Sequence, residues 1–327
     1  MILVPNNDSS MINREELVVF LCEKMLSKEP IYINLNNEGP CAKSLGLYDL
    51  LDQLCEKYKY EKSLITIITC NLIETHSDYK IEIKPQMMYL ESAREFVSQT
   101  PFIGKKFDDK FRHFGNFIGH GNLHRLHIAS YLSDRYSMLS LQTYHYRTGD
   151  EYHRKFVGIE DMLFMSYDIS EINRAYKFLK SCPITLDQID SYPILNPATL
   201  NITKVYPDFF IEIVNLTYFS GDTFYIDEKI WRPMIMKTPF LVQGPQNFIN
   251  NLKKLGFKTF DRWWDEGYSE DPERSQIDGI LQNIDSLSQL SLAELKVMYS
   301  DMQSVLEHNY QRCMEISVND FFSVCQQ

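Results

Sequence analysis

The strongest constraint on the fold is a strand–helix–strand pattern near the amino terminus. Residues 31–35 (IYINL) form an apolar run of strand length, and 62–73 (KSLITIITCNLI) form a second run that is rich in β-branched residues. Between them, LYDLLDQLCEKY (47–58) places its leucines at helical spacing. Apolar strands joined by a helix are typical of parallel sheets that are covered on both faces. We therefore predict a βαβ unit, which KIEIKP extends by a further strand from Lys80.

A second set of α/β signals fills the rest of the chain. FGNFIG (114–119) predicts a strand, and it is followed by a turn and a helix. Further strands are predicted at 139–147, 209–219, 239–244 and 258–260. Helices are predicted at 126–136, 169–182, 227–237 and 245–256, and in several segments after Asp271. These alternating elements indicate a second parallel sheet.

The polar, Pro-containing stretch 98–113 is interpreted as the linker between the two sheets. We predict an α/β protein with two Rossmann-like domains that face each other across a cleft. The predicted domains are 1–108 on the amino-terminal side and 109–290 on the carboxyl-terminal side. A helical tail (291–327) completes the chain and could cross back to the first domain.

Composition excludes several classes of protein. The 33 basic and 44 acidic residues give a net charge of −11, which argues against a nucleic-acid-binding protein. No apolar stretch reaches the length of a membrane span, and the amino terminus does not resemble a secretory signal. The seven cysteines are scattered without a CxxC pair, so neither a disulfide framework nor a zinc site is indicated. We therefore expect a cytoplasmic protein without a membrane span.

Three loops after predicted strands carry residues suited to ligand chemistry, because doubly wound sheets bind ligands at the carboxyl ends of their strands. In the first loop (117–125), glycines precede Arg125 at a helix start, where free amides and a guanidinium favour a phosphate. In the second, Glu228 suits ribose hydroxyls, and Lys229 or Arg232 suits phosphate oxygens. The third offers Glu38 as a general base. Ordinary turn and helix-cap chemistry explains the same residues, so both interpretations stay open.

Histidines around the first loop invite a metal interpretation, because His120, His124 and His127 are spaced by four and three residues. No carboxylate is placed like the glutamate of an HExxH motif, and only His124 and His127 fall clearly on the predicted helix. We therefore predict no metal site.

Residues 209–256 resemble the donor-binding segment of fucosyltransferase-like glycosyltransferases of the GT-B fold. That segment has a strand ending in an Asn-containing turn, then Tyr-x-x-Glu-Lys at a helix start, then a Pro-led apolar strand ending in Gly-Pro. The matching residues of this chain are Asn215, Tyr225, Glu228, Lys229, Pro239, Gly244 and Pro245. The continuation, with GFKTF before an acidic and aromatic loop, is similar to bacterial and viral relatives.

The resemblance implies a set of donor-binding residues. FIGHGNLHR (117–125) resembles the start of the family's second domain, in which an arginine contacts the donor diphosphate, and Arg125 is the matching residue. By the resemblance, Lys229 also contacts the diphosphate and Glu228 contacts the ribose. Tyr225 would lie near the nucleotide or sugar, Asn215 would support the turn, and Arg232 would reinforce the positive charge.

The implied activity is an inverting, metal-independent transfer of a hexose or pentose from a GDP- or UDP-linked sugar to a glycan hydroxyl, with no cofactor. The amino-terminal half carries no family motif, so the catalytic base is argued from position alone. Glu38 is the first candidate, and Glu74 and Asp78 after the next strand are the others. Two other functions remain open. They are a non-catalytic nucleotide-sugar or glycan-binding protein and a sugar-nucleotide epimerase.

Overall fold

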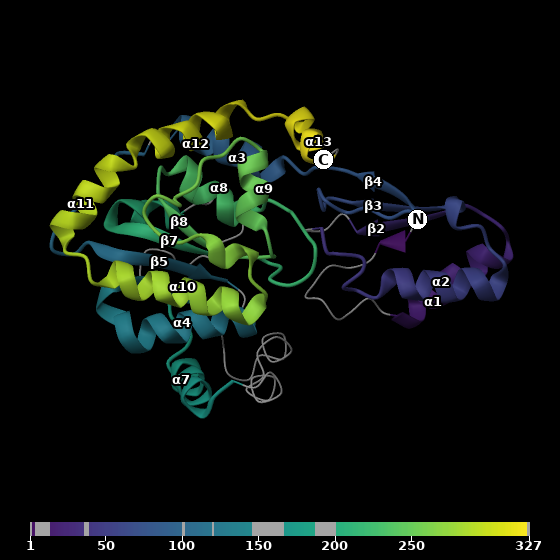
Figure 1. Ribbon diagram of the computed structural model, residues 1–327, viewed down its shortest axis with the longest axis horizontal. Coiled ribbons are helices and arrows are strands. Elements are labelled where there is room, and N and C mark those ends of the chain that lie inside the picture. Colours follow the sequence, from purple (N-terminus) through teal and green to yellow (C-terminus); the bar gives the residue numbers. More distant parts are fainter. Residues whose placement is uncertain are drawn as a thin grey trace.

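The computed structural model describes residues 2–3, 14–35, 39–99, 102–119, 121–145, 167–186 and 201–325. In this part of the chain, two separate parallel sheets confirm the predicted α/β class and are consistent with two Rossmann-like domains (Figure 1).

The first sheet contains four parallel strands in the order β1-β2-β3-β4. Their bounds are β1 Ile2–Leu3, β2 Ile31–Leu35, β3 Ile65–Thr69 and β4 Lys80–Ile83. Helices α1 (Arg14–Leu26) and α2 (Leu47–Tyr58) lie side by side on one face of this sheet (Figure 1). Every residue of β3 is buried, as expected for a central strand of a parallel sheet. The predicted βαβ unit and the strand from Lys80 are confirmed.

The second sheet has the order β6-β5-β7-β8, and all its strands are parallel. Its strands are β5 Arg112–Ile118, β6 Ser140–Tyr144, β7 Phe209–Asn215 and β8 Phe240–Gln243. One face is covered by α4 (Leu123–Tyr136) and α10 (Glu273–Ser288), with α7 (Ile169–Lys180) packed outside α4 (Figure 1). The segment at 258–260 forms no strand, which corrects that prediction. Its backbone is hydrogen-bonded to side chains instead. Asn309 bonds both the amide and the carbonyl of Lys258, and Glu266 accepts from the Phe260 amide.

The opposite face of this sheet carries helices from the first and the last third of the chain (Figure 1). They are α3 Met88–Gln99, α8 Glu228–Ile235, α9 Phe248–Lys254 and α12 Gln303–Glu315. Helix α11 (Leu292–Asp301) joins α10 to α12, and α13 (Val318–Cys325) is the last element. Short 3-10 helices complete the fold at η1 Lys62–Leu64, η2 Ser137–Leu139, η4 Asn201–Asp208 and η5 Gly267–Glu270.

Helix α3 links the two units, although it packs with the second. Leu90, Ala93 and Val97 belong to the same apolar core as β7, whereas the core of the first unit runs from Leu17 to Ile81. Helix α12 packs against both α3 and α8. The guanidinium of Arg94 on α3 donates to the carbonyls that end α12. The stretch expected as linker (98–113) thus contains the last residues of α3 and the first residues of β5.

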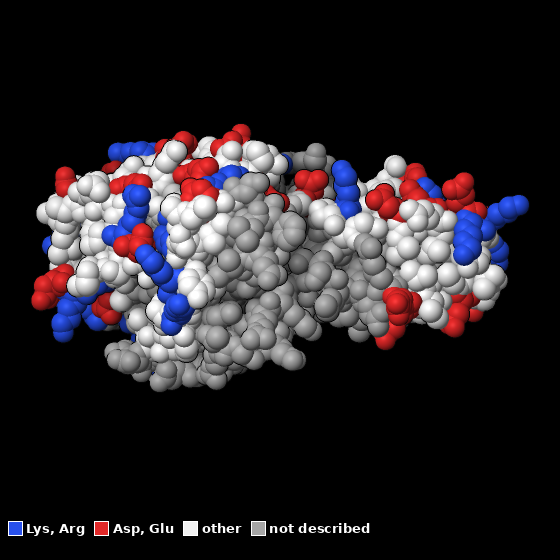
Figure 2. Space-filling model, turned by 90° about the horizontal axis from the view of Figure 1, so that it is seen from below, with Lys and Arg blue, Asp and Glu red and all other residues white. Residues whose placement is uncertain are grey.

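The surface agrees with the mixed composition. Figure 2 shows basic and acidic side chains intermingled over the described part of one face. Among the described residues, no helix combines the length and apolar character that crossing a bilayer requires.

Candidate functional site

The order of strands in the second sheet creates a switch point between β5 and β7. The chain leaves β5 toward β6 on one side, whereas β7 and β8 extend the sheet on the other side. Loops that leave two such neighbouring strands diverge, and the crevice between them is where doubly wound sheets bind their ligands. In this chain those loops lead into α4, whose first turn holds Arg125, and into α8, at whose start the Tyr225–Lys229 motif lies.

Two recesses lie along the segment that follows β7. The larger has a volume of about 410 Å³, within the range of roughly 300–1,000 Å³ for small-molecule pockets. Its walls are Phe219–Asp222, Gln246, Asp271–Arg274 and Gln276. The smaller recess has a volume of about 10 Å³, room for about one water molecule, and is lined by Leu216–Tyr218, Thr223, Tyr225, Asp227 and Pro245. We call residues 219–225 the pocket loop, because they contribute to both recesses.

Lys229 carries the most accessible charge at the start of α8. Asp227 is the N-cap of this helix, and its Oδ1 accepts from the Lys229 amide at 3.0 Å. The Lys229 Nζ lies 2.9 Å from Asp227 Oδ2 and 2.7 Å from Glu228 Oε1. The side chain of Lys229 is 13% exposed, whereas those of Asp227 and Glu228 are 2% and 3% exposed. Lys229 is therefore the least buried side chain of this cluster, and its ammonium group is bonded to both carboxylates.

Arg125 connects the loops after β5 and β7. Asn122 is the N-cap of α4, and its Oδ1 accepts from the Arg125 amide at 3.1 Å. The Arg125 side chain is buried, and its Nη2 donates to the carbonyl of Leu216 at 2.7 Å. This contact brings the predicted arginine to the first residue after β7, at the rim of the smaller recess.

A buried row of amide side chains crosses the same ends of the strands. Asn116 of β5 donates to Gln142 of β6 at 2.8 Å, and Asn215 of β7 donates to Asn116 at 2.7 Å. Gln243 of β8 donates to the carbonyl of His124 on α4 at 3.1 Å. We call these four side chains the amide row. The Oδ1 of Asn215 and the Oε1 of Gln243 have no hydrogen-bond partner among the described residues. The Asn215 amide nitrogen also donates to the carbonyl of Ile213 at 3.0 Å, so the printed bonds of this side chain are made to strand residues.

Tyr225 lies between the two units. Its ring is mostly buried against the smaller recess, and its hydroxyl donates to Gln86 Oε1 at 3.0 Å, just before α3. The structure thus gathers Arg125, Asn215, Tyr225, Glu228 and Lys229 around the start and end of the segment after β7.

Arg232 lies apart from this group. It is buried one turn into α8, and its Nη2 donates to Glu212 Oε1 at 2.9 Å. Glu212 also accepts a hydrogen bond from the hydroxyl of Tyr206. Because side chains alternate along a strand, Glu212 faces the side of the sheet opposite to Asn215. Arg232 contributes to neither recess.

The three candidate bases come from the amino-terminal part of the sequence. Glu38 lies outside the described residues, although the carbonyl of the adjacent Gly39 accepts from the Thr223 hydroxyl of the pocket loop. Glu74 is buried and accepts from Tyr48 at 2.6 Å, from Asn71 at 2.9 Å and from the Ala42 amide at 3.2 Å. Three donors thus occupy its oxygens. Asp78 is exposed and pairs with Lys62 at 2.9 Å.

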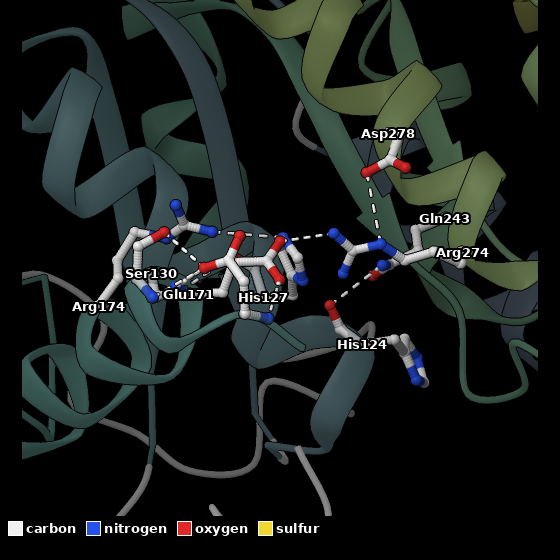
Figure 3. Close-up of polar contacts among 10 residues, drawn as sticks. His124, His127, Ser130, Glu171, Arg174, Gln243, Arg274 and Asp278 are labelled. Atoms are coloured by element: carbon white, nitrogen blue, oxygen red, sulfur yellow. Dashed lines mark hydrogen bonds and ion pairs between the residues drawn. The ribbon is translucent and has the colours of Figure 1, made fainter. Parts of the chain in front are cut away.

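A cluster behind the larger recess joins α4, α7 and α10 (Figure 3). Glu171 forms a capping box with Asp168 at the start of α7, and it accepts from Arg274 Nη2 at 2.6 Å. The Nε2 of His127 lies 3.4 Å from Glu171 and 3.3 Å from Arg174. Burial lowers the pKa of His127 to about 4, so its ring is neutral at pH 7. The ion pairs of this cluster are therefore Glu171–Arg274 and, at 3.6 Å, Arg274–Asp278.

Of this cluster, the sequence analysis singles out His127 alone, as a residue weighed for a metal site. The capping-box pattern of Asp168 and Glu171 is visible in the sequence, but it does not reveal contacts with α4 and α10. His124 stacks on Phe219, with 4.7 Å between the ring centroids, and thereby supports a wall of the larger recess. His120 lies outside the described residues. Among those that are described, no three His, Cys, Asp or Glu side chains are grouped to hold a metal ion.

A comparison of this chain with known protein families, with curated proteins and with solved structures finds no match.

Proposed function

We propose that this protein is a GT-B glycosyltransferase that binds a nucleotide-diphosphate-sugar at the carboxyl end of its second sheet. The observation that carries the proposal is the grouping of Arg125, Tyr225, Glu228 and Lys229 around one segment at the switch point, beside the smaller recess and next to the pocket loop that lines the larger one. The same residues are those that the resemblance to fucosyltransferase-like enzymes assigned to the donor.

Each side chain has a role that fits its position. Lys229 turns from its carboxylate neighbours toward the diphosphate oxygens, and Arg125 adds a second cation from α4. Glu228 accepts from ribose hydroxyls, and Tyr225 lies near the nucleotide or sugar. Arg232 has a structural role in this proposal, because its guanidinium is bound to Glu212 on the other face of the sheet.

The proposed reaction inverts the anomeric carbon. The acceptor hydroxyl oxygen forms a bond to that carbon, the bond to the leaving diphosphate oxygen breaks, and a base takes the hydroxyl proton. The two cations stabilise the negative charge that develops on the leaving group. We assign the base to Glu38, since the oxygens of Glu74 already accept from three donors.

A thermal-shift screen against GDP, UDP, CDP and dTDP, with and without EDTA, tests the proposal. A ligand at 100 times its dissociation constant stabilises a protein by about 2.7 kcal/mol. We expect one diphosphate to stabilise this protein, and EDTA to leave the shift unchanged. No shift with any of them at millimolar concentration contradicts the proposal. Incubating the protein with the donor alone then separates transfer from epimerisation, because only an epimerase changes the sugar without an acceptor.

A further inference from the structure

The pocket loop is held between the two units at Phe224. The residues before it line the larger recess, and Thr223 and Tyr225 on either side line the smaller one. Phe224 itself is fully buried, and its ring packs edge-on against Phe248 of α9 with 5.2 Å between the centroids. The side chain of this residue is therefore anchored in the core of the second unit.

The backbone of Phe224 is bonded to the first unit instead. Its N–H donates to Asn71 Oδ1 at 2.8 Å, and its carbonyl accepts from the Leu72 amide at 2.9 Å. Asn71 Nδ2 also donates to the carbonyl of Asp222 at 2.9 Å. One side chain from the loop after β3 thus bonds the pocket loop at two residues, Asp222 and Phe224.

Asn71 is itself held in a single orientation. An amide side chain has two N–H donors and two acceptor lone pairs. Here the second donor bonds Glu74 Oε2 at 2.9 Å, and the second lone pair accepts from the Ile73 amide at 3.3 Å. Asn71 is fully buried, so no water competes for these bonds. Because all four hydrogen-bonding positions of this amide are used, any other orientation of the side chain would lose hydrogen bonds.

We infer that Asn71 is a positioning residue of the ligand site: it holds the pocket loop in the shape that forms both recesses. Ligand affinity in the second unit thereby depends on a residue of the first unit that need not touch the ligand. As regards the ligand, this inference rests on the proposed function. Without Asn71, a ligand would have to order the loop at the moment of binding, and that lost entropy would weaken its affinity.

The matched pair of variants is Asn71→Ala and Asn309→Ala. Like Asn71, Asn309 is a buried asparagine whose side chain bonds the backbone of a distant segment. It accepts from the Lys258 amide at 2.9 Å and donates to the Lys258 carbonyl at 2.8 Å. It lies on α12, outside both recesses. Both variants should lose free energy of unfolding, whereas only Asn71→Ala should lose the positioning of the pocket loop.

Two measurements decide the inference: hydrogen exchange of the Phe224 amide, and the dissociation constant of the nucleoside diphosphate that stabilises the wild type. We expect Asn71→Ala to exchange at least 10-fold faster and to bind at least 10-fold more weakly, and Asn309→Ala to match the wild type in both. Wild-type exchange or affinity in Asn71→Ala overturns the inference. If Asn71→Ala does not fold, Asn71→Ser replaces it, because the shorter side chain keeps a polar group at this position but cannot bond both Asp222 and Phe224 as the amide does.

The two hypotheses fail in different ways. If the wild type binds none of the diphosphates, the proposed function is wrong. The exchange comparison then decides alone whether Asn71 holds the pocket loop, because it needs no ligand.

Discussion

The buried ion pair between Arg232 and Glu212 gives the sharpest test of the structural role assigned to Arg232. Replacing Arg232 by Met removes the guanidinium 2.9 Å from Glu212, whose side chain is about 1% exposed. Breaking a buried pair by removing one partner typically costs about 3–5 kcal/mol, because the other charge is left uncompensated. Total stabilities of domains are about 5–15 kcal/mol, so Arg232→Met should lose a large fraction of the free energy of unfolding.

The loss should also depend on pH. Burial raises the pKa of Glu212, and Arg232 opposes this shift. Without Arg232 the folded-state pKa rises further above that of the unfolded chain, so the folded state binds the extra proton. Stability contributed by such a group is present at low pH and is lost as the pH rises. The difference between Arg232→Met and the wild type should therefore be smaller at pH 5.5 than at pH 8.

Urea unfolding at both pH values measures this difference. The double variant Glu212→Gln/Arg232→Met removes both charges, and it should recover most of the lost free energy. A loss below about 1 kcal/mol for Arg232→Met, or a loss that does not change with pH, would refute the reasoning. Once folded, Arg232→Met should bind the nucleoside diphosphate as the wild type does.

Three further changes test other parts of the structure. Lys229→Met should weaken nucleoside-diphosphate binding at least 10-fold in a titration, about 1.4 kcal/mol, and Lys237→Met on an exposed ion pair serves as its control with unchanged affinity. The lowered pKa of His127 means that the unfolded chain binds more protons below pH 6.5. Stability should therefore fall as the pH drops from 6.5 toward 4, and His127→Gln should flatten this slope in unfolding titrations. Gly115→Ala would place a Cβ 2.6 Å from the ring of Phe209 and should cost about 1–3 kcal/mol by the same unfolding assay; an unchanged midpoint would contradict the close contact.

Local periodicity predicted most of the fold, and its failures have physical reasons. The apolar runs at β3 and β7 predicted strands correctly, since every residue of these two strands is buried. Helix α3 was missed because the polar stretch at its end suggested a linker, although Leu90, Ala93 and Val97 repeat at helical spacing. Strand β5 begins two residues before the predicted strand, with the side chain of His113 bonded to the Leu290 carbonyl at 2.8 Å.

In the candidate site, contacts between sequence neighbours could be predicted, whereas contacts between residues far apart in the sequence could not. The start of α8 could be predicted because Asp227, Glu228 and Lys229 are neighbours in sequence, and their cap and charge contacts are local. The partner of Arg232 lies 20 residues earlier on β7, and that of Asn71 lies about 150 residues later. No local pattern indicates such pairs, because they depend on which elements the fold brings together.

The amide row bears on how the second sheet finds its correct pairing. Strands that are apolar on both faces could slide past one another with little change in buried apolar area. Asn116 and Gln142 are partners in the β5–β6 register, as are Asn215 and Gln243 in the β7–β8 register. A shift of β5 against β6 or β7 would break the bond from Asn116 to Gln142 or that from Asn215 to Asn116, at a cost of about 1–3 kcal/mol for each polar group left unpaired in the apolar interior. These two bonds thus favour one offset of the central strand β5 against its neighbours β6 and β7.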